Sequence, residues 1–134
     1  MRQDMREPMS DERQLDRLAQ ELFHRRGEGV IVPRPKGLVV TEEWKPVGER
    51  CHDNVDHWVT HHPGTEAVRG FLVLDYMTFT RFTAHSIIRS PEGDLLDITP
   101  SRATRAYPFI VHRGTDELFE AVIHVEHLDY VLTK

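Results

Sequence analysis

The pentapeptide SPEGD at residues 90–94 constrains this chain more than any other segment. Its proline presets a φ angle of about −65°, and its glycine tolerates a positive φ, so the pair is typical of a tight chain reversal. The flanking segments, residues 82–89 (FTAHSIIR) and 94–99 (DLLDIT), are rich in β-branched and apolar residues. They are therefore predicted to form the two strands of an antiparallel hairpin.

The hairpin places a histidine and an aspartate on one face. If the first and last residues of the turn pair, odd-numbered residues of both arms share a face, because side chains alternate along a strand. His85 then lies opposite Thr99, and Asp97 lies opposite Ile87. His85 and Asp97 become diagonal neighbours, roughly 7–8 Å apart at the backbone and within reach of a side-chain hydrogen bond. This prediction requires a turn without a bulge, since one extra residue would reverse the parity.

The single cysteine, Cys51, lies at the predicted start of a helix that ends before Pro63. Unpaired N–H groups and the helix dipole at that position favour the thiolate, which is the nucleophilic form of the side chain. Three apolar residues follow at helical spacing: Val55, Trp58 and Val59. The cysteine is therefore predicted to lie on the helix face that packs against the rest of the protein.

Caps, breaks and hydrophobic periodicity predict the other elements. The N-terminal part is predicted to contain a polar leader over residues 1–9, a helix from Ser10 or Asp11 to about Arg26, two short extended pieces within residues 30–40 and a loop from Trp44 to Arg50. The remaining predicted elements are strands at 67–74 and 109–112, a short helix (DELFEAVI) capped by Thr115, and a strand at about 125–132 for which a helix is the alternative. We therefore expect a single α+β domain over residues 10–134. In it, the helix bearing Cys51 packs on a small, mostly antiparallel sheet, and the N-terminal helix covers another surface.

Composition argues against several other classes of protein. One cysteine among 134 residues rules out an intrachain disulfide and a multi-cysteine zinc module. The net charge is −5 and no basic stripe stands out, which argues against nucleic-acid binding. The sequence contains no apolar run of about 18 residues, so no membrane span is predicted. The charged N-terminal segment does not resemble a signal peptide. We therefore expect a cytoplasmic protein. No glycine-rich phosphate-binding motif is present, and no cofactor is expected.

Four segments in order, CHDNVDHWV, VRGFLVL, AHSII and LLDITP, resemble the papain-like superfamily, especially its transglutaminase-like branch. In that family a cysteine opens a helix and a strand follows. The histidine lies on the next strand, and the aspartate comes about a dozen residues later on the neighbouring one. The resemblance covers about residues 48–100. It implies a minimal papain-like fold with Cys51 as nucleophile, His85 as base and Asp97 as the acid that orients the histidine.

Two positions depart from the family pattern. Ile87 stands where an aromatic residue often follows the histidine, and Lys45 stands in place of the glutamine that helps papain-type enzymes bind the oxyanion. The remaining candidates for oxyanion or substrate contacts are the backbone N–H of Cys51 and the side chains of Asn54 and Trp44.

The resemblance implies a hydrolase or acyltransferase that acts on amide or peptide-type bonds through a Cys51–His85–Asp97 triad. The cysteine would form a thioester, which water or an amine would resolve. Two alternatives stay open. The chain could be a catalytically inactive papain-like interaction module in which Cys51 is structural. It could also bind a metal through its histidines or through the three triad residues.

The histidine-rich helix is the reason for considering a metal. His57 and His61 are four residues apart, so two imidazoles could reach one ion from one helix face, although no glutamate sits between them as in zincins. Solvated helix residues are the simpler interpretation of both.

Overall fold

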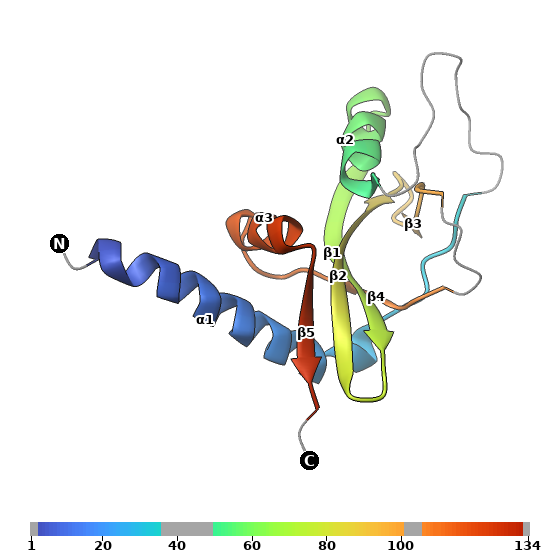
Figure 1. The fold of residues 1–134 in the computed structure, drawn as a ribbon. Coiled ribbons are helices and arrows are strands. Elements are labelled where there is room, and N and C mark those ends of the chain that lie inside the picture. The colour runs from blue at the N-terminus through green and yellow to red at the C-terminus, as the bar shows by residue number, and fades with distance from the viewer. Residues whose placement is uncertain (1–2, 36–49, 101–105, 133–134) are drawn as a thin grey trace.

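The structure, a computed structural model, describes residues 3–35, 50–100 and 106–132. The elements follow in the order α1 (Gln3–His24), a 3-10 turn η1 (Arg26–Glu28), α2 (Cys51–His61), β1 (Glu66–Asp75), β2 (Phe79–Arg89), β3 (Leu95–Leu96), β4 (Phe109–Val111), α3 (Asp116–Val125) and β5 (His127–Val131). The expected α+β class is confirmed, with an N-terminal helix and with the helix bearing Cys51 packed on an antiparallel sheet (Figure 1).

The five strands form one curled antiparallel sheet in the order β3-β2-β1-β4, and β5 also pairs with β2. The long β1–β2 hairpin is its centre, paired from Glu66 with Arg89 to Asp75 with Thr80. β2 has two further partners along its length, β3 beside its C-terminal end and β5 beside its N-terminal half. Every other strand is therefore positioned by its pairing with β1 or β2.

The turn at residues 90–94 closes as predicted. The Ser90 N–H donates to the Asp94 carbonyl at 2.8 Å, and Gly93 has a φ of 97°. The ladder continues without a bulge, with Arg89 opposite Leu95 and the next residues paired in register. The predicted parity of the hairpin is therefore confirmed. The second strand is much shorter than the predicted 94–99 because the Asp97 N–H leaves the ladder and donates to the Pro33 carbonyl at 2.9 Å.

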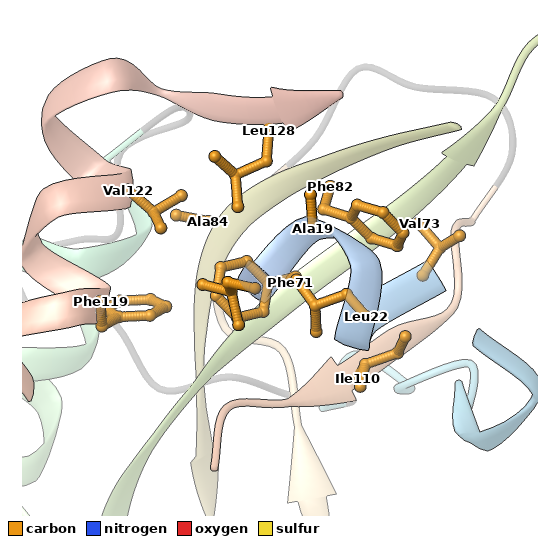
Figure 2. Close-up of a cluster of buried hydrophobic side chains, with 11 residues drawn as sticks. Ala19, Leu22, Phe71, Val73, Phe82, Ala84, Ile110, Phe119, Val122 and Leu128 are labelled. Carbon is orange, nitrogen blue, oxygen red and sulfur yellow. The ribbon is translucent and has the colours of Figure 1, made fainter. Parts of the chain in front are cut away.

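The largest core cluster lies where α1 and α3 pack on the sheet, and its apolar side chains converge from both helices and from the strands (Figure 2). Its buried members are Leu18, Ala19, Leu22, Phe71, Val73, Phe82, Ala84, Ile110, Phe119, Val122 and Leu128.

A second cluster orients α2. Val55, Ile88 and Ile98 are buried together, with Trp58 and Val59 packed against them. The predicted apolar stripe of the helix is thus confirmed as the face that contacts the sheet. This contact holds the first residue of α2, Cys51, near β2.

Helix α1 begins at Gln3, so the predicted start at Ser10 or Asp11 is wrong and the helix overlaps the predicted leader over residues 1–9 from position 3 onward. The prediction used Pro8 as a helix breaker, whereas the helix continues through it, and the preceding residues QDMRE have ordinary helix propensity. None of the helices in the described ranges is long and apolar enough to cross a bilayer.

The later elements agree with the sequence. The Thr115 hydroxyl oxygen caps α3 by accepting from the Leu118 N–H at 3.1 Å, and the last segment is the strand β5 rather than a helix. Of the extended pieces expected within residues 30–40, the described part forms an isolated bridge between Val30 and Phe109. The rest of that segment, and the loop expected from Trp44, lie outside the described residues up to position 49.

Candidate active site

His85 and Asp97 are joined by a hydrogen bond between their side chains. The His85 Nε2–H donates to Asp97 Oδ2 at 2.8 Å, and about 12% and 13% of the two side chains remain exposed. The other carboxylate oxygen, Oδ1, accepts from the Thr99 N–H at 3.1 Å. Because Nε2 is committed to the carboxylate, Nδ1 is the nitrogen of His85 that is left to exchange a proton.

Three contacts from two parts of the chain hold the segment that carries Asp97. Its own N–H donates to Pro33, and the neighbouring Arg34 side chain donates to the Thr99 carbonyl. From α2, the Asn54 Nδ2 group donates to Thr99 Oγ1 at 3.0 Å, and Asn54 is almost fully buried. We therefore assign this Asn54 amide group to linking α2 with the aspartate segment. Trp44, the other side chain considered for the oxyanion, lies outside the described residues.

Cys51 is the first residue of α2, and its thiol is free and half-buried. The residue before it, Arg50, makes no side-chain capping hydrogen bond to the helix. The first N–H groups of a helix have no partner within the helix, so these donors stay beside the thiol. The local geometry favours negative charge on the sulfur.

The thiol and the imidazole shift each other's pKa in opposite directions. Burial raises the pKa of Cys51, but hydrogen bonds with His52 and His85 and their positive charge outweigh it and lower the pKa to about 6. Burial lowers the pKa of His85, but hydrogen bonds with Asp97 and Cys51 and their negative charge raise it to about 9. At a pH between these two values, the shifts favour the thiolate of Cys51 and the imidazolium of His85.

Phe109 forms a wall of the site beside His85. The two rings lie at an interplanar angle of 70°, with centroids 6.3 Å apart. Gly70 lies directly opposite His85 in the β1–β2 ladder, and the Phe109 ring occupies the space that a side chain at position 70 would need. A Cβ at position 70 would also meet the Ile110 carbonyl. The glycine thus permits the aromatic ring to approach the backbone next to the histidine.

A second set of polar residues lies between the start of α2 and strands β1 and β2. His52 is another histidine of α2, and its ring nitrogen Nδ1 lies 2.6 Å from the hydroxyl of the fully buried Ser86 of β2. Ser86 in turn contacts Arg69 of β1, its cross-strand partner. One signal could have pointed to this set: His52 and Asp56 are four residues apart on one face of α2, and Asp56 pairs with Arg69.

The histidines considered as metal ligands are arranged differently. The rings of His57 and His61 stack with centroids 4.2 Å apart, and Nδ1 of His61 contacts the carbonyl of His57. Within the parts of the chain that the structure describes, no group of three or more His, Cys, Asp or Glu side chains is arranged to hold a metal ion.

The chain matches no protein-family model, no curated protein and no solved structure. The resemblance to papain-like enzymes therefore stays a prediction.

Proposed function

We propose that this protein is a cysteine-nucleophile hydrolase or acyltransferase that acts on amide or peptide-type bonds. The observation that carries the proposal is the hydrogen bond of His85 to Asp97, beside a cysteine at the start of a helix. The opposite pKa shifts of Cys51 and His85 support the same conclusion, because they provide a nucleophile and a proton donor at neutral pH.

In the proposed reaction, the Cys51 thiolate attacks the substrate carbonyl carbon. A carbon–sulfur bond forms, and the carbonyl electron pair moves to the oxygen. The tetrahedral intermediate then collapses and breaks the carbon–nitrogen bond, while the leaving amine takes the Nδ1 proton of His85. Water or a second amine attacks the resulting thioester, gives its proton to the neutral imidazole and releases the thiolate. Asp97 holds the ring and balances its positive charge.

The developing oxyanion needs hydrogen-bond donors near the sulfur. We assign this role to backbone N–H groups at the start of α2, beginning with that of Cys51. The contact of Asn54 with Thr99 makes its Nδ2 group a less suitable donor than these N–H groups. A reduced thiolate fits the reducing cytoplasm, which is the compartment we propose.

The test is covalent acylation of the intact protein by p-nitrophenyl acetate, followed by intact-mass spectrometry. We expect an acetyl group on Cys51, rapid acylation in the wild-type protein, and none at this position in Cys51→Ser. Acylation at pH 7 should be slower by up to about 30-fold in His85→Ala, because the pKa of the Cys51 thiol moves from about 6 toward about 8.5 and the thiolate fraction falls. Added hydroxylamine should yield acetohydroxamate if the acyl group can be transferred to an amine.

The matched control is His61→Ala, which removes another histidine of α2 whose ring stacks on His57 and contacts the His57 carbonyl. This variant should acylate at the wild-type rate. The proposal would be abandoned if Cys51 acylates at the rate of a free thiol, or if His85→Ala reacts as fast as the wild type.

A further inference from the structure

Four polar side chains connect the start of α2 to the two central strands. The ring nitrogen Nδ1 of His52 lies 2.6 Å from Ser86 Oγ on β2, and Arg69 Nη1 on β1 donates to the same oxygen at 2.8 Å. The other end of the guanidinium, Nη2, donates to Asp56 Oδ1 at 2.7 Å. We call these four residues the Ser86 clamp. They hold α2 at two points that lie about one turn apart.

The inner end of the clamp is buried and the outer end reaches the surface. Ser86 is fully buried, and a buried hydroxyl needs a hydrogen-bond partner. An arginine can only donate, so Ser86 Oγ accepts from Arg69. A hydroxyl has two lone pairs and one proton, so Ser86 can pair with His52 Nδ1 whichever of the two supplies the proton. The clamp therefore closes in each protonation state of the histidine.

The inner pair of the clamp consists of the direct neighbours of two candidate catalytic residues. His52 follows Cys51 in α2, and Ser86 follows His85 in β2. The contact of 2.6 Å between the two neighbours limits how far the start of α2 can move from the strand that carries His85. A hydrogen bond between these neighbours is thus placed to control the geometry between the thiol and the imidazole.

We propose that the four residues of the Ser86 clamp are positioning residues, which set the separation between the Cys51 thiol and the His85 imidazole. The inference rests on the proposed function for its catalytic meaning. Its physical content is the separation of two ionisable groups, which can be tested through their ionisation without any substrate. The pKa values of Cys51 and His85 are each shifted in part by the other group, so both shifts depend on this separation.

The first experiment replaces Ser86 with alanine and follows the ionisation of both groups. Iodoacetamide alkylation against pH gives the midpoint of Cys51, and the ring NMR shifts against pH give that of His85. A looser clamp should move the Cys51 midpoint up from about 6 and the His85 midpoint down from about 9. We expect a change of about one pH unit in each, and alkylation roughly fivefold slower at pH 6.

Thr80→Val is the matched control for Ser86→Ala. Thr80 is also buried and lies on the same face of β2, and its hydroxyl donates to Asp75 Oδ1 at 2.9 Å. The substitution removes a buried hydroxyl contact at the other end of the strand. It should lower the unfolding free energy and leave both midpoints unchanged. A positioning role and a purely structural role of Ser86 are therefore distinguished by the midpoints.

The second variant, Asp56→Ala, changes a side chain that is 60% exposed, so we expect it to fold. Loss of the negative charge alone would lower the pKa of Cys51, whereas loss of the anchor for Arg69 loosens the clamp and raises it. We expect a rise of about half a pH unit and alkylation about twofold slower at pH 6. The control is Asp129→Ala, which breaks the pair with Arg81 between β5 and β2 and should leave the midpoint unchanged.

Unchanged midpoints in a folded Ser86→Ala protein, or a lowered Cys51 midpoint in Asp56→Ala, would overturn the inference. If Ser86→Ala does not fold, Asp56→Ala decides alone. Wild-type midpoints of about 8.5 for Cys51 and about 6.5 for His85 would also overturn it, because the two groups would then not be held together. Shifted midpoints in the variants without any acylation by p-nitrophenyl acetate would instead refute the proposed function alone.

Discussion

Nε2 of His85 lies 2.8 Å from Oδ2 of Asp97, although Asp97 lies just beyond the last paired residue of β3. The ladder sets the face on which the aspartate emerges, but it does not hold the carboxylate. That task falls to the Pro33 carbonyl, which accepts from the Asp97 N–H, and to the Thr99 N–H, which donates to the carboxylate. The orientation of the imidazole therefore depends on residues outside the hairpin.

Replacing Asp97 with asparagine should lower the upper pH limit of reactivity. Burial lowers the pKa of His85, and the hydrogen bond and charge of Asp97 are among the main causes that raise it to about 9. Without the charge, the imidazolium should lose its proton at a lower pH. We expect the alkaline limb of the p-nitrophenyl acetate acylation profile to move down from about 9.

Asp94→Asn is the matched control for this substitution. Asp94 lies in the same hairpin and is exposed, and its backbone N–H rather than its carboxylate contacts Ser90. Its acylation profile should match the wild type. An unchanged alkaline limb in Asp97→Asn would show that the carboxylate does not set the protonation of His85.

The Cys51 thiol should ionise at acidic pH. Alkylation by iodoacetamide should reach half of its maximal rate near pH 6, because hydrogen bonds with His52 and His85 outweigh the effect of burial. In His85→Ala the midpoint should move upward, toward the value of about 8.5 for a free cysteine. A wild-type midpoint near 8.5 would mean that no ion pair forms.

Folding stability should depend little on pH through this pair between about pH 6.5 and 8.5, which are the ordinary pKa values of a histidine and a cysteine in an unfolded chain. The lowered pKa of Cys51 alone adds stability that is lost as the pH falls through about 6. The raised pKa of His85 alone adds stability that is present below pH 6.5 and lost as the pH rises through about 9. In that window the folded pair and the unfolded pair each hold one proton, so the slope is zero.

Urea unfolding of the wild type and of the Cys51→Ala/His85→Gln double variant at several pH values measures this slope. The difference between their unfolding free energies removes the contribution of the other titrating groups, which both proteins share. If the thiolate faced a neutral His85 instead, the wild type would gain about 1.4 kcal/mol of unfolding free energy per pH unit across that window. A flat difference combined with a thiol midpoint near 6 is therefore specific to the ion pair.

Thr99→Val should both destabilise the protein and loosen the site. The substitution keeps the shape of the side chain but leaves the buried Nδ2 group of Asn54 without its Thr99 acceptor. We expect a loss of about 1–3 kcal/mol in unfolding free energy, measured by urea unfolding, and slower acylation. Thr99→Ser retains the hydroxyl and is the control. Equal stability of the two variants would contradict the role assigned to Asn54.

Gly70→Ala should destabilise the sheet next to His85. The added methyl group would collide with the Phe109 ring and the Ile110 carbonyl, so β4 must shift. Overpacking of this kind costs about 1–3 kcal/mol, which thermal or urea unfolding can measure. At Gly27 an added Cβ meets no atom within 4 Å, so Gly27→Ala is the control and should be close to neutral. Similar effects of the two substitutions would argue against the Phe109 contact.

The contact between His85 and Asp97 could be predicted from the sequence because a tight turn fixes parity, and parity fixes which side chains share a face. The helix that begins at Cys51 could also be predicted, because the spacing of Val55, Trp58 and Val59 indicates a helix and the face on which it packs. Contacts between segments that are distant in sequence could not be predicted from local patterns. Two examples are the hydrogen bond from the Asp97 N–H to the Pro33 carbonyl, which ends β3, and the contact between the Ser86 hydroxyl and His52. Both depend on how the chain folds back on itself.

The order of elements around β2 has a consequence for synthesis on the ribosome. α2, β1, β2 and β3 are consecutive, so the stretch from Cys51 to Asp97 emerges as one contiguous piece, and its contacts close short loops. Phe71 and Phe82 are covered by α1, which emerges before them, and by α3 and β5, which emerge after them. Until α3 and β5 have emerged, part of this apolar sheet face stays exposed on the nascent chain, where it can associate with other chains.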